Sequence, residues 1–180
     1  MEKNIIGHIE KEYKVLITEE EYLKLLANYR TTSRIQSNYY FDSNPSLKER
    51  DISIRIREIS NHYYFTLKEK KAEIIEYEFE IPTFSLEHEQ IKNITSNFNI
   101  KGLKLKGKLV TVRSIFRDDF GELCIDKNSY NNTVDYEVEY ELFDSNTDQL
   151  KHFKDLLSVA EISYVQNNIS KVARCLKKGE

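Results

Sequence analysis

The stretch Ile9-Glu-Lys-Glu-Tyr-Lys-Val15 decides how the rest of this chain is interpreted. Successive side chains of a β-strand point to opposite faces, so Glu10, Glu12 and Lys14 share one face of an extended segment. A half-buried strand ordinarily turns its apolar residues to the core and its charges to water. The return of charged alternation in later segments indicates one common face built from ionised groups.

Charged residues alternate with apolar ones along most of the remaining chain. Arg55 and Arg57 alternate with isoleucines in 51–58, and Lys68 and Lys70 share a face in 63–70. Four further segments show the same period of two: Glu76, Glu78 and Glu80 in 74–81, Arg113 and Arg117 in 109–117, Asp126 in 122–126, and Glu137, Glu139 and Glu141 in 135–142. With 9–15 and 37–42, these segments predict eight antiparallel strands.

Four amphipathic segments are predicted to form helices. Thr18 and Glu21 have the spacing of a capping box, which starts a helix that runs to about Tyr29. The other helices are expected over 85–98, with Ser85 as the cap, over 147–160 and over 168–178. Helices with one apolar side need a sheet face to cover.

The charged strand faces have two alternative orientations. If the apolar residues point inward, the barrel is an ordinary packed one with a solvated charged surface. If the charges point inward, the apolar faces are left for the helices. The charges are sorted by sign between strands, which favours the second orientation, because solvated faces more often mix signs. The sequence therefore predicts an α+β fold, an eight-stranded antiparallel β-barrel with a charged interior, covered by amphipathic helices.

The composition limits the class of protein. A length of 180 residues fits one domain over 1–180, and a net charge of −3 argues against general nucleic-acid binding. No apolar run is long enough for a membrane span, and 1–8 lack the apolar region of a secretory signal. Cys124 and Cys175 have no metal or disulfide spacing, so free thiols are expected. We expect a cytoplasmic monomer or homodimer without nucleic-acid or membrane partners.

Cations and carboxylates on rigid strands suit phosphate chemistry. Guanidinium binds two phosphate oxygens in a fork, and ammonium acts as a point charge. Carboxylates without His or Cys ligands select a hard cation such as Mg²⁺ or Mn²⁺. The four histidines have no metal spacing, and the chain contains no P-loop. Together these features predict phosphoryl transfer from a metal-bound polyphosphate, with no side-chain nucleophile.

The stretch Glu10-Lys-Glu12-Tyr-Lys14 resembles the ExExK signature of the CYTH domain, or triphosphate tunnel metalloenzymes, and the chain is most similar to the short bacterial members of Gram-positive type. Further segments resemble the family in the same order: Asn38-Tyr-Tyr-Phe-Asp-Ser43, Arg55-Ile-Arg57, Thr66-Leu-Lys68, Glu76 with Glu78, Thr111-Val-Arg113, Leu123-Cys-Ile-Asp126, Tyr136-Glu137-Val-Glu139 and Ser170-Lys171. The resemblance implies an eight-stranded antiparallel tunnel, open at both ends, with acids and bases lining its bore.

The resemblance also implies roles for individual residues. One or two ions of Mg²⁺ or Mn²⁺ would be bound by Glu10, Glu12, Asp126, Glu137 and Glu139. A small triphosphate would be held by Lys14, Arg55, Arg57, Lys68, Arg113 and Lys171. The expected catalytic residues are Glu10, Glu12, Lys14 and Lys171. Secondary candidates are Lys70, Glu76, Glu78 and Arg117.

Several activities occur in this family, and the sequence favours one of them. We expect metal-dependent hydrolysis of a small triphosphate, inorganic tripolyphosphate in particular, with release of orthophosphate, because the compact chain offers no base-recognition element. The alternatives are a class IV-type adenylate cyclase, which would form cyclic AMP and pyrophosphate, and a thiamine or nucleoside triphosphatase. A non-catalytic polyphosphate-binding module is a further alternative.

Overall fold

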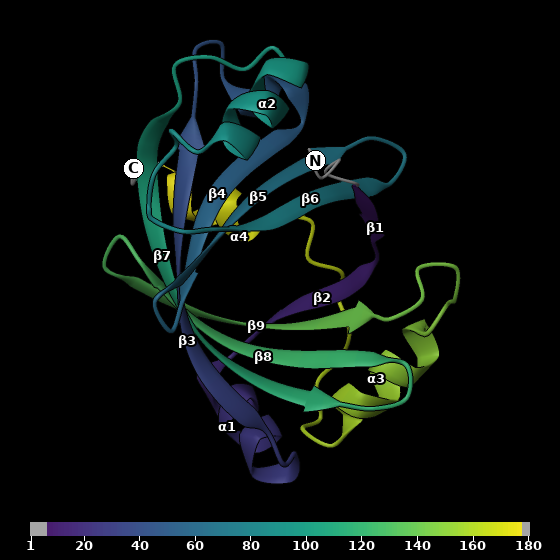
Figure 1. Ribbon diagram of the computed structural model, residues 1–180. Helices are drawn as coiled ribbons and strands as arrows, with labels where there is room; N and C mark the ends of the chain where they lie inside the picture. The colour runs from purple at the N-terminus through teal and green to yellow at the C-terminus, as the bar shows by residue number, and fades with distance from the viewer. Residues whose placement is uncertain (1–6, 178–180) are drawn as a thin grey trace.

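A computed structural model describes residues 7–177 and shows a nearly closed antiparallel β-barrel with four α-helices (Figure 1). The strands are β1 (His8–Glu10), β2 (Glu12–Ile17), β3 (Thr32–Asp42), β4 (Ile52–Ile59), β5 (His62–Lys70), β6 (Ile74–Ile81), β7 (Lys104–Arg117), β8 (Gly121–Tyr130) and β9 (Thr133–Leu142). The helices are α1 (Glu19–Asn28), α2 (Glu89–Asn97), α3 (Leu150–Ser158) and α4 (Lys171–Leu176), with a short 3₁₀ helix, η1 (Leu47–Arg50). The predicted α+β barrel is confirmed, with nine strands instead of eight.

The ninth strand arises because the predicted first strand is broken at Lys11. The sheet order is β1-β6-β5-β4-β3-β7-β8-β9-β2, so β1 and β2 lie at opposite ends of one sheet. One continuous strand would have to pair with both β6 and β9, and the chain instead changes partner at Lys11. The Lys11 carbonyl accepts a hydrogen bond from the Leu142 amide at 3.0 Å, which ties this junction to the end of β9. The two end strands of the sheet are therefore connected directly by the backbone at Lys11.

The apolar faces of the strands point outward and are covered by helices. Helices α1 and α3 lie below β8, β9 and β2 in Figure 1, where Leu25 and Phe153 pack with strand residues such as Val138. Helix α2 covers β4, β5 and β6, where Ile91 packs with strand residues such as Ile54. Burial of this apolar surface supplies most of the driving force for folding. The helical coverage inferred from the amphipathic patterns is confirmed for α1, α2 and α3.

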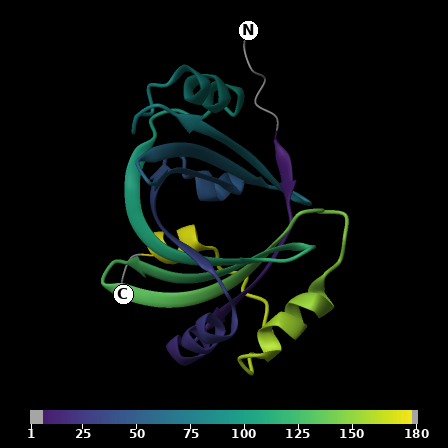
Figure 2. The ribbon, with the colours of Figure 1, turned by 60° about the horizontal axis from the view of Figure 1, so that its bottom comes forward.

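Helix α4 differs from the other three because it packs on the inner face of the barrel. Val172, Cys175 and Leu176 contact Tyr40, Leu109 and Tyr130, which all belong to the inward-facing sides of their strands. A Cβ atom on Gly107 would lie 2.7 Å from a methyl carbon of Leu176 and 3.1 Å from Cys175 Sγ, so a larger residue at this position would have to displace these two side chains of the helix. Figure 2 shows α4 within the curve of the sheet. One mouth of the barrel is therefore filled by α4, and the expectation of a tunnel open at both ends is wrong at this mouth.

The helix boundaries differ from the predictions in specific ways. The capping box of α1 is confirmed, because the Glu21 amide donates to Thr18 Oγ1 at 3.2 Å and the Thr18 amide donates to Glu21 Oε2 at 2.7 Å. The cap predicted at Ser85 is wrong: its hydroxyl accepts from the Glu87 amide in a local turn, and α2 begins after His88. Helix α3 starts at Leu150, and α4 starts at Lys171, with Lys178 outside the described residues.

Three strands extend four or five residues beyond their predicted ends. Strand β3 begins at Thr32 instead of Ser37, β7 begins at Lys104 instead of Leu109, and β8 continues past Asp126 to Tyr130. The tight turn after β8 is formed by Asn131 and Asn132, both with positive φ, a conformation that asparagine tolerates. Within residues 7–177, none of the helices combines the length and apolarity that a bilayer crossing requires.

Candidate active site

The lower wall of the bore in Figure 1 carries an acidic cluster from adjacent strands β8 and β9. Asp126 and Glu137 are fully buried, and Glu139 is 7% exposed. The ammonium of Lys171, at the start of α4, lies 2.7 Å from Asp126 Oδ2, 2.7 Å from Glu139 Oε1 and 3.1 Å from Glu137 Oε2. Burial opposes the charge of Lys171, but these carboxylates raise its pKa well above the usual value. The structure therefore brings Lys171 together with three predicted metal ligands.

The side chain of Ser170 positions Lys171, because its hydroxyl accepts from the Ala173 amide at 3.2 Å and caps α4. One turn later, Arg174 donates to Glu137 Oε2 at 2.9 Å and to Asp135 Oδ2 at 2.8 Å. Arg174 was absent from the predicted site residues. Its position one helical turn from Lys171 is the signal that could have identified it.

The guanidinium of Arg113 on β7 is the second cation of the acidic cluster. It forms a fork with Asp126, with Nε to Oδ1 at 2.9 Å and Nη2 to Oδ2 at 2.8 Å, and donates from Nη1 to Glu141 at 2.8 Å. It also forms an ion pair with Glu139. Burial opposes its charge, yet Asp126 and Glu141 help to raise its pKa above the usual value. Arg113, a predicted phosphate ligand, and the predicted metal ligands Asp126 and Glu139 therefore belong to one network of ion pairs.

The three carboxylates of Glu12, Glu139 and Glu141 form a second group of acids. One oxygen atom from each of them lies within 4.8 Å of one oxygen atom from each of the other two. Lys14 lies 2.7 Å from Glu12. Burial first, and then the neighbouring charge of Glu139, raise the pKa of Glu12 to about 7. Such a group is stabilised by a bound cation, and its oxygen-only donor set fits a hard divalent ion. Glu141 had been placed on this face by the sequence but was not among the predicted ligands.

Glu10 lies apart from this carboxylate group. Both of its oxygens accept from Lys68 Nζ, at 2.6 and 2.5 Å, and Lys68 also lies 2.6 Å from Glu76. Burial raises the pKa of Glu76, but Lys68 and Arg55 outweigh it and lower the pKa to about 2. Among the described residues, the groups of acids close enough to share one ion do not include Glu10. In the structure Glu10 therefore pairs with Lys68, a cation of β5, instead of with the other predicted metal ligands.

The upper wall of the bore carries cations on β4 and β5. Arg55 lies 3.9 Å from Glu78 and donates to Thr66 Oγ1 at 3.3 Å. Arg57 donates to the neutral Asn38 Oδ1 at 3.2 Å. Within residues 7–177, no carboxylate lies within 4.0 Å of the Arg57 guanidinium, and burial together with the charge of Arg55 lowers its pKa to about 10. Arg57 is thus a half-buried cation without an anionic partner among the described residues.

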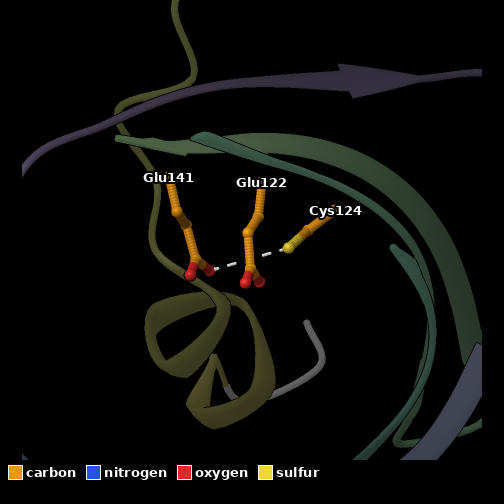
Figure 3. A group of neighbouring side chains, drawn as sticks. All are labelled: Glu122, Cys124 and Glu141. Carbon is orange, nitrogen blue, oxygen red and sulfur yellow. Dashed lines mark hydrogen bonds between the residues drawn. The ribbon is translucent and has the colours of Figure 1, made fainter. Parts of the chain in front are cut away.

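The remaining candidates lie nearer the ends of the strands. Lys70 is exposed at the end of β5, and Arg117 pairs with Glu122 at 2.5 Å. Cys124 lines the bore and is fully buried, and burial raises the pKa of its thiol. Figure 3 shows Cys124, Glu122 and Glu141 pointing to the same side of their strands, with the thiol donating to Glu141 at 3.9 Å. Cys124 is a tunnel-lining residue, and both cysteines are free.

These features define an antiparallel tunnel with an ionic bore, one mouth of which is filled by a helix. The model of the CYTH domain family matches residues 8–176. The chain therefore belongs to the CYTH domain family, and the resemblance that the charged motifs indicated is confirmed.

Individual relatives carry two kinds of name. The chain is 27% identical over 149 residues to a Bacillus subtilis (strain 168) protein named "Putative triphosphatase YjbK", covering 76% of this chain and 78% of that protein. It is 26% identical to a "putative adenylate cyclase" from Bacillus halodurans, whose crystal structure superimposes with a TM-score of 0.79 over 93% of this chain and 97% of the other. The fold is shared with the Hippeastrum protein HpAC1, at 22% identity and a TM-score of 0.75 over 92% and 94% of the two chains.

Proposed function

We propose that this protein hydrolyses a small triphosphate in a metal-dependent reaction, and that inorganic tripolyphosphate is the substrate. The Bacillus subtilis relative, which matches about three quarters of the chain, supports a triphosphatase by its name. HpAC1 shares the fold, and its description gives a dominant triphosphatase activity to that protein. The chemistry of the bore residues supports the same reaction for this chain.

One observation carries this proposal: cations and carboxylates face each other across an enclosed bore. Arg55, Arg57 and Lys68 lie on β4 and β5, and the buried carboxylates lie on β8 and β9 on the other side (Figure 1). Charges in a low-dielectric interior interact far more strongly than charges at a surface. A triphosphate with its metal presents both signs of charge, and so complements both walls at once.

In this proposal the cations bind and orient the phosphate chain. Arg57 binds phosphate oxygens most readily, because it has only a neutral partner to give up. Arg55 and Lys68 keep their positions through Glu78, Glu10 and Glu76. The acidic wall adds the cations Lys14, Arg113 and Lys171. Held in line, the terminal phosphorus accepts the oxygen of water while its bond to the bridging oxygen breaks. Pyrophosphate is the leaving group, the terminal phosphate becomes orthophosphate, and the protons of the water pass to the two products and to solvent.

The proposed metal is Mg²⁺ or Mn²⁺, as one or two ions. Glu12, Glu139 and Glu141 fit such an ion by their oxygen donors and mutual distances, and Asp126, Glu137 and Glu10 are the further candidates. When bound, the ion would neutralise charge on the phosphate oxygens. The Lys171 ammonium forms ion pairs with Asp126, Glu137 and Glu139. It would share these carboxylates with any ion bound nearby.

We further propose a cytoplasmic protein with a small-molecule substrate. Two free, buried thiols fit a reducing compartment. The net charge of −3 fits a phosphate compound held inside the bore better than nucleic acid bound over the outer surface.

Adenylate cyclase is the second candidate, and the 26% identity to the Bacillus halodurans protein with that name favours it. A cyclase must place the ribose 3′-hydroxyl beside the α-phosphate and release pyrophosphate. A hydrolase of the proposed kind releases orthophosphate and tolerates loss of the nucleoside.

The test is a substrate panel of tripolyphosphate, ATP and thiamine triphosphate, each with Mg²⁺, with Mn²⁺ and with EDTA, followed by identification of the products. The proposal predicts fastest release of orthophosphate from tripolyphosphate and none in EDTA. Formation of cyclic AMP and pyrophosphate from ATP, with tripolyphosphate left intact, would replace the proposal by the cyclase.

A further inference from the structure

The side-chain amide of Gln36, on β3, lies inside the barrel without a protein donor for its oxygen. Gln36 is 2% exposed and shares the inward face of β3 with Asn38, which is 1% exposed, and with Tyr40, which contacts α4. Among the residues that the structure describes, none forms a hydrogen bond with Gln36 Oε1. A buried acceptor without a donor destabilises a fold, so such atoms are rare in native proteins. An unpaired acceptor inside the bore therefore points to a donor that binds there.

The side chains beside Gln36 on the two adjacent strands do not supply this donor. Thr111 lies opposite Gln36 on β7, but its hydroxyl donates to Asn128 Oδ1 at 2.8 Å. Ile59 lies opposite Gln36 on β4 and has an apolar side chain. Neither neighbouring strand therefore satisfies Gln36 Oε1.

The position of Gln36 relative to Arg57 limits which molecule can be the donor. Asn38, which accepts from Arg57 Nε at 3.2 Å, lies two residues after Gln36 on the same face of β3. At the rise of an extended strand, this separation is about 7 Å. A phosphate bound by Arg57 presents acceptor oxygens, which do not satisfy another acceptor. A water molecule does, because it donates to Gln36 and keeps a lone pair for the phosphorus.

The separation also has the length that one water molecule requires. A hydrogen bond of about 2.8 Å from the water to Gln36 Oε1, followed by an approach of about 3–3.5 Å from the water oxygen to phosphorus, spans about 6 Å. This length is close to the distance between neighbouring inward positions on β3. One water therefore fits between the amide and a phosphate at Arg57, whereas a second would not.

We propose that Gln36 positions the water that attacks the terminal phosphate bound by Arg57. Gln36 Oε1 accepts a hydrogen bond from this water, so that a lone pair of the water oxygen points at the phosphorus. The new oxygen–phosphorus bond forms while the bond to the bridging oxygen breaks. Pyrophosphate leaves with that electron pair, and the protons of the water pass to the two products and to solvent. This inference rests on the proposed function, and glutamine orients the attacking water in the same way in GTPases.

The competing role for Gln36 is phosphate binding, in which the amide Nε2 donates to a phosphate oxygen. That role leaves Oε1 without a partner, whereas a bound water satisfies it. The two roles differ in what the loss of the amide changes. Loss of a phosphate ligand weakens binding of the substrate, and loss of a water-positioning residue slows the reaction of the bound substrate.

The experiment replaces Gln36 by methionine, which has a similar length and only a weak acceptor. The matched control, Gln90→Met, removes the same amide from α2, which lies outside the barrel. Release of orthophosphate from tripolyphosphate gives kcat, and calorimetry in EDTA gives the Kd of tripolyphosphate. We expect Gln36→Met to lower kcat about a hundredfold, the size of a misaligned attack, and to leave Kd within about twofold of the wild type. Gln90→Met should match the wild type in both.

Two further measurements distinguish this role from a structural one. The urea midpoint of Gln36→Met should equal or exceed that of the wild type, because the replacement removes a buried acceptor that has no protein donor. Gln36→Glu keeps an acceptor oxygen at this position, so it should retain a higher kcat than Gln36→Met.

Three results would overturn the inference. The first is a wild-type kcat in Gln36→Met, and the second is an equally low kcat in Gln36→Met and Gln36→Glu. The third is a loss explained otherwise: a Kd weakened about tenfold at unchanged kcat makes Gln36 a phosphate ligand, and a lowered urea midpoint makes it a structural residue. Failure of the proposed function looks different, because the wild-type protein with Mg²⁺ or Mn²⁺ then releases no orthophosphate from tripolyphosphate.

Discussion

Replacement of Lys171 by methionine should destabilise the metal-free protein by about 3 kcal/mol. The ammonium contacts Asp126, Glu137 and Glu139, two of which are fully buried. Loss of one partner from a buried ion pair costs about 3–5 kcal/mol, because a buried charge is left uncompensated. Arg113 and Arg174 still contact these carboxylates, which places the expected cost at the lower end of that range.

The assay is urea unfolding in EDTA, followed by circular dichroism. For a slope of about 1–3 kcal/mol per molar urea, the midpoint should fall by about 1–3 M. A matched control is Lys101→Met, which removes the same charge from an exposed loop and should leave the midpoint within about 0.3 M.

Divalent metal should then stabilise Lys171→Met more than it stabilises the wild type, because the variant has no ammonium among the carboxylates. A ligand at one hundred times its Kd adds about 2.7 kcal/mol to the free energy of unfolding. A variant as stable as the wild type in EDTA would refute the assignment of Lys171 as the counter-ion of the acidic cluster. Equal metal stabilisation of both proteins would refute competition for the same oxygens.

Three further replacements test other parts of the molecule. Arg57→Ala should raise the KM for tripolyphosphate about tenfold or more, while the free energy of unfolding stays within about 1 kcal/mol, because no carboxylate loses its partner; an unchanged KM in steady-state kinetics contradicts this. Glu76→Gln should cost up to about 3 kcal/mol at pH 7, since the folded-state pKa of Glu76 is lowered from 4.5 to about 2. That stabilisation is present above about pH 4.5 and is lost as the pH falls towards 2, so the difference from the wild type should narrow in acid; a constant difference in urea unfolding would be inconsistent. Thr18→Ala should cost about 1 kcal/mol through loss of the capping box and leave the rate of hydrolysis unchanged, because α1 lies outside the barrel; a slower rate at full folding would argue against this.

The inward orientation of the charges could be predicted because it is encoded locally. A period of two fixes which residues share a face, and the sorting of charge by strand showed that this face was not a solvated one. The burial of Asp126, Arg113 and Glu139 agrees with that interpretation. The outer helices followed from the apolar periodicity of the same sequence.

The break at Lys11 could not be predicted, because the alternation of 9–15 continues through it without interruption. The break results from sheet closure, which places β1 beside β6 and β2 beside β9, and no local residue signals this. The partners in the ion pairs could not be predicted from the sequence either, because they lie far apart along it. Glu10, for example, pairs with Lys68, 58 positions away. The start of β3 was placed too late because its first segment, Thr32-Ser-Arg34-Ile-Gln36, has weak strand character.

The central claim is that a triphosphate lies inside the bore, between the cations of β4 and β5 and the carboxylates of β8 and β9. The most direct measurement is a crystal structure of the Glu12→Gln variant with tripolyphosphate and Mn²⁺, with manganese located by anomalous scattering. The account predicts phosphate oxygens on Arg55, Arg57 and Lys68, with manganese beside Glu139. Tripolyphosphate found only on the outer surface, with the bore residues paired as they are now, would contradict it.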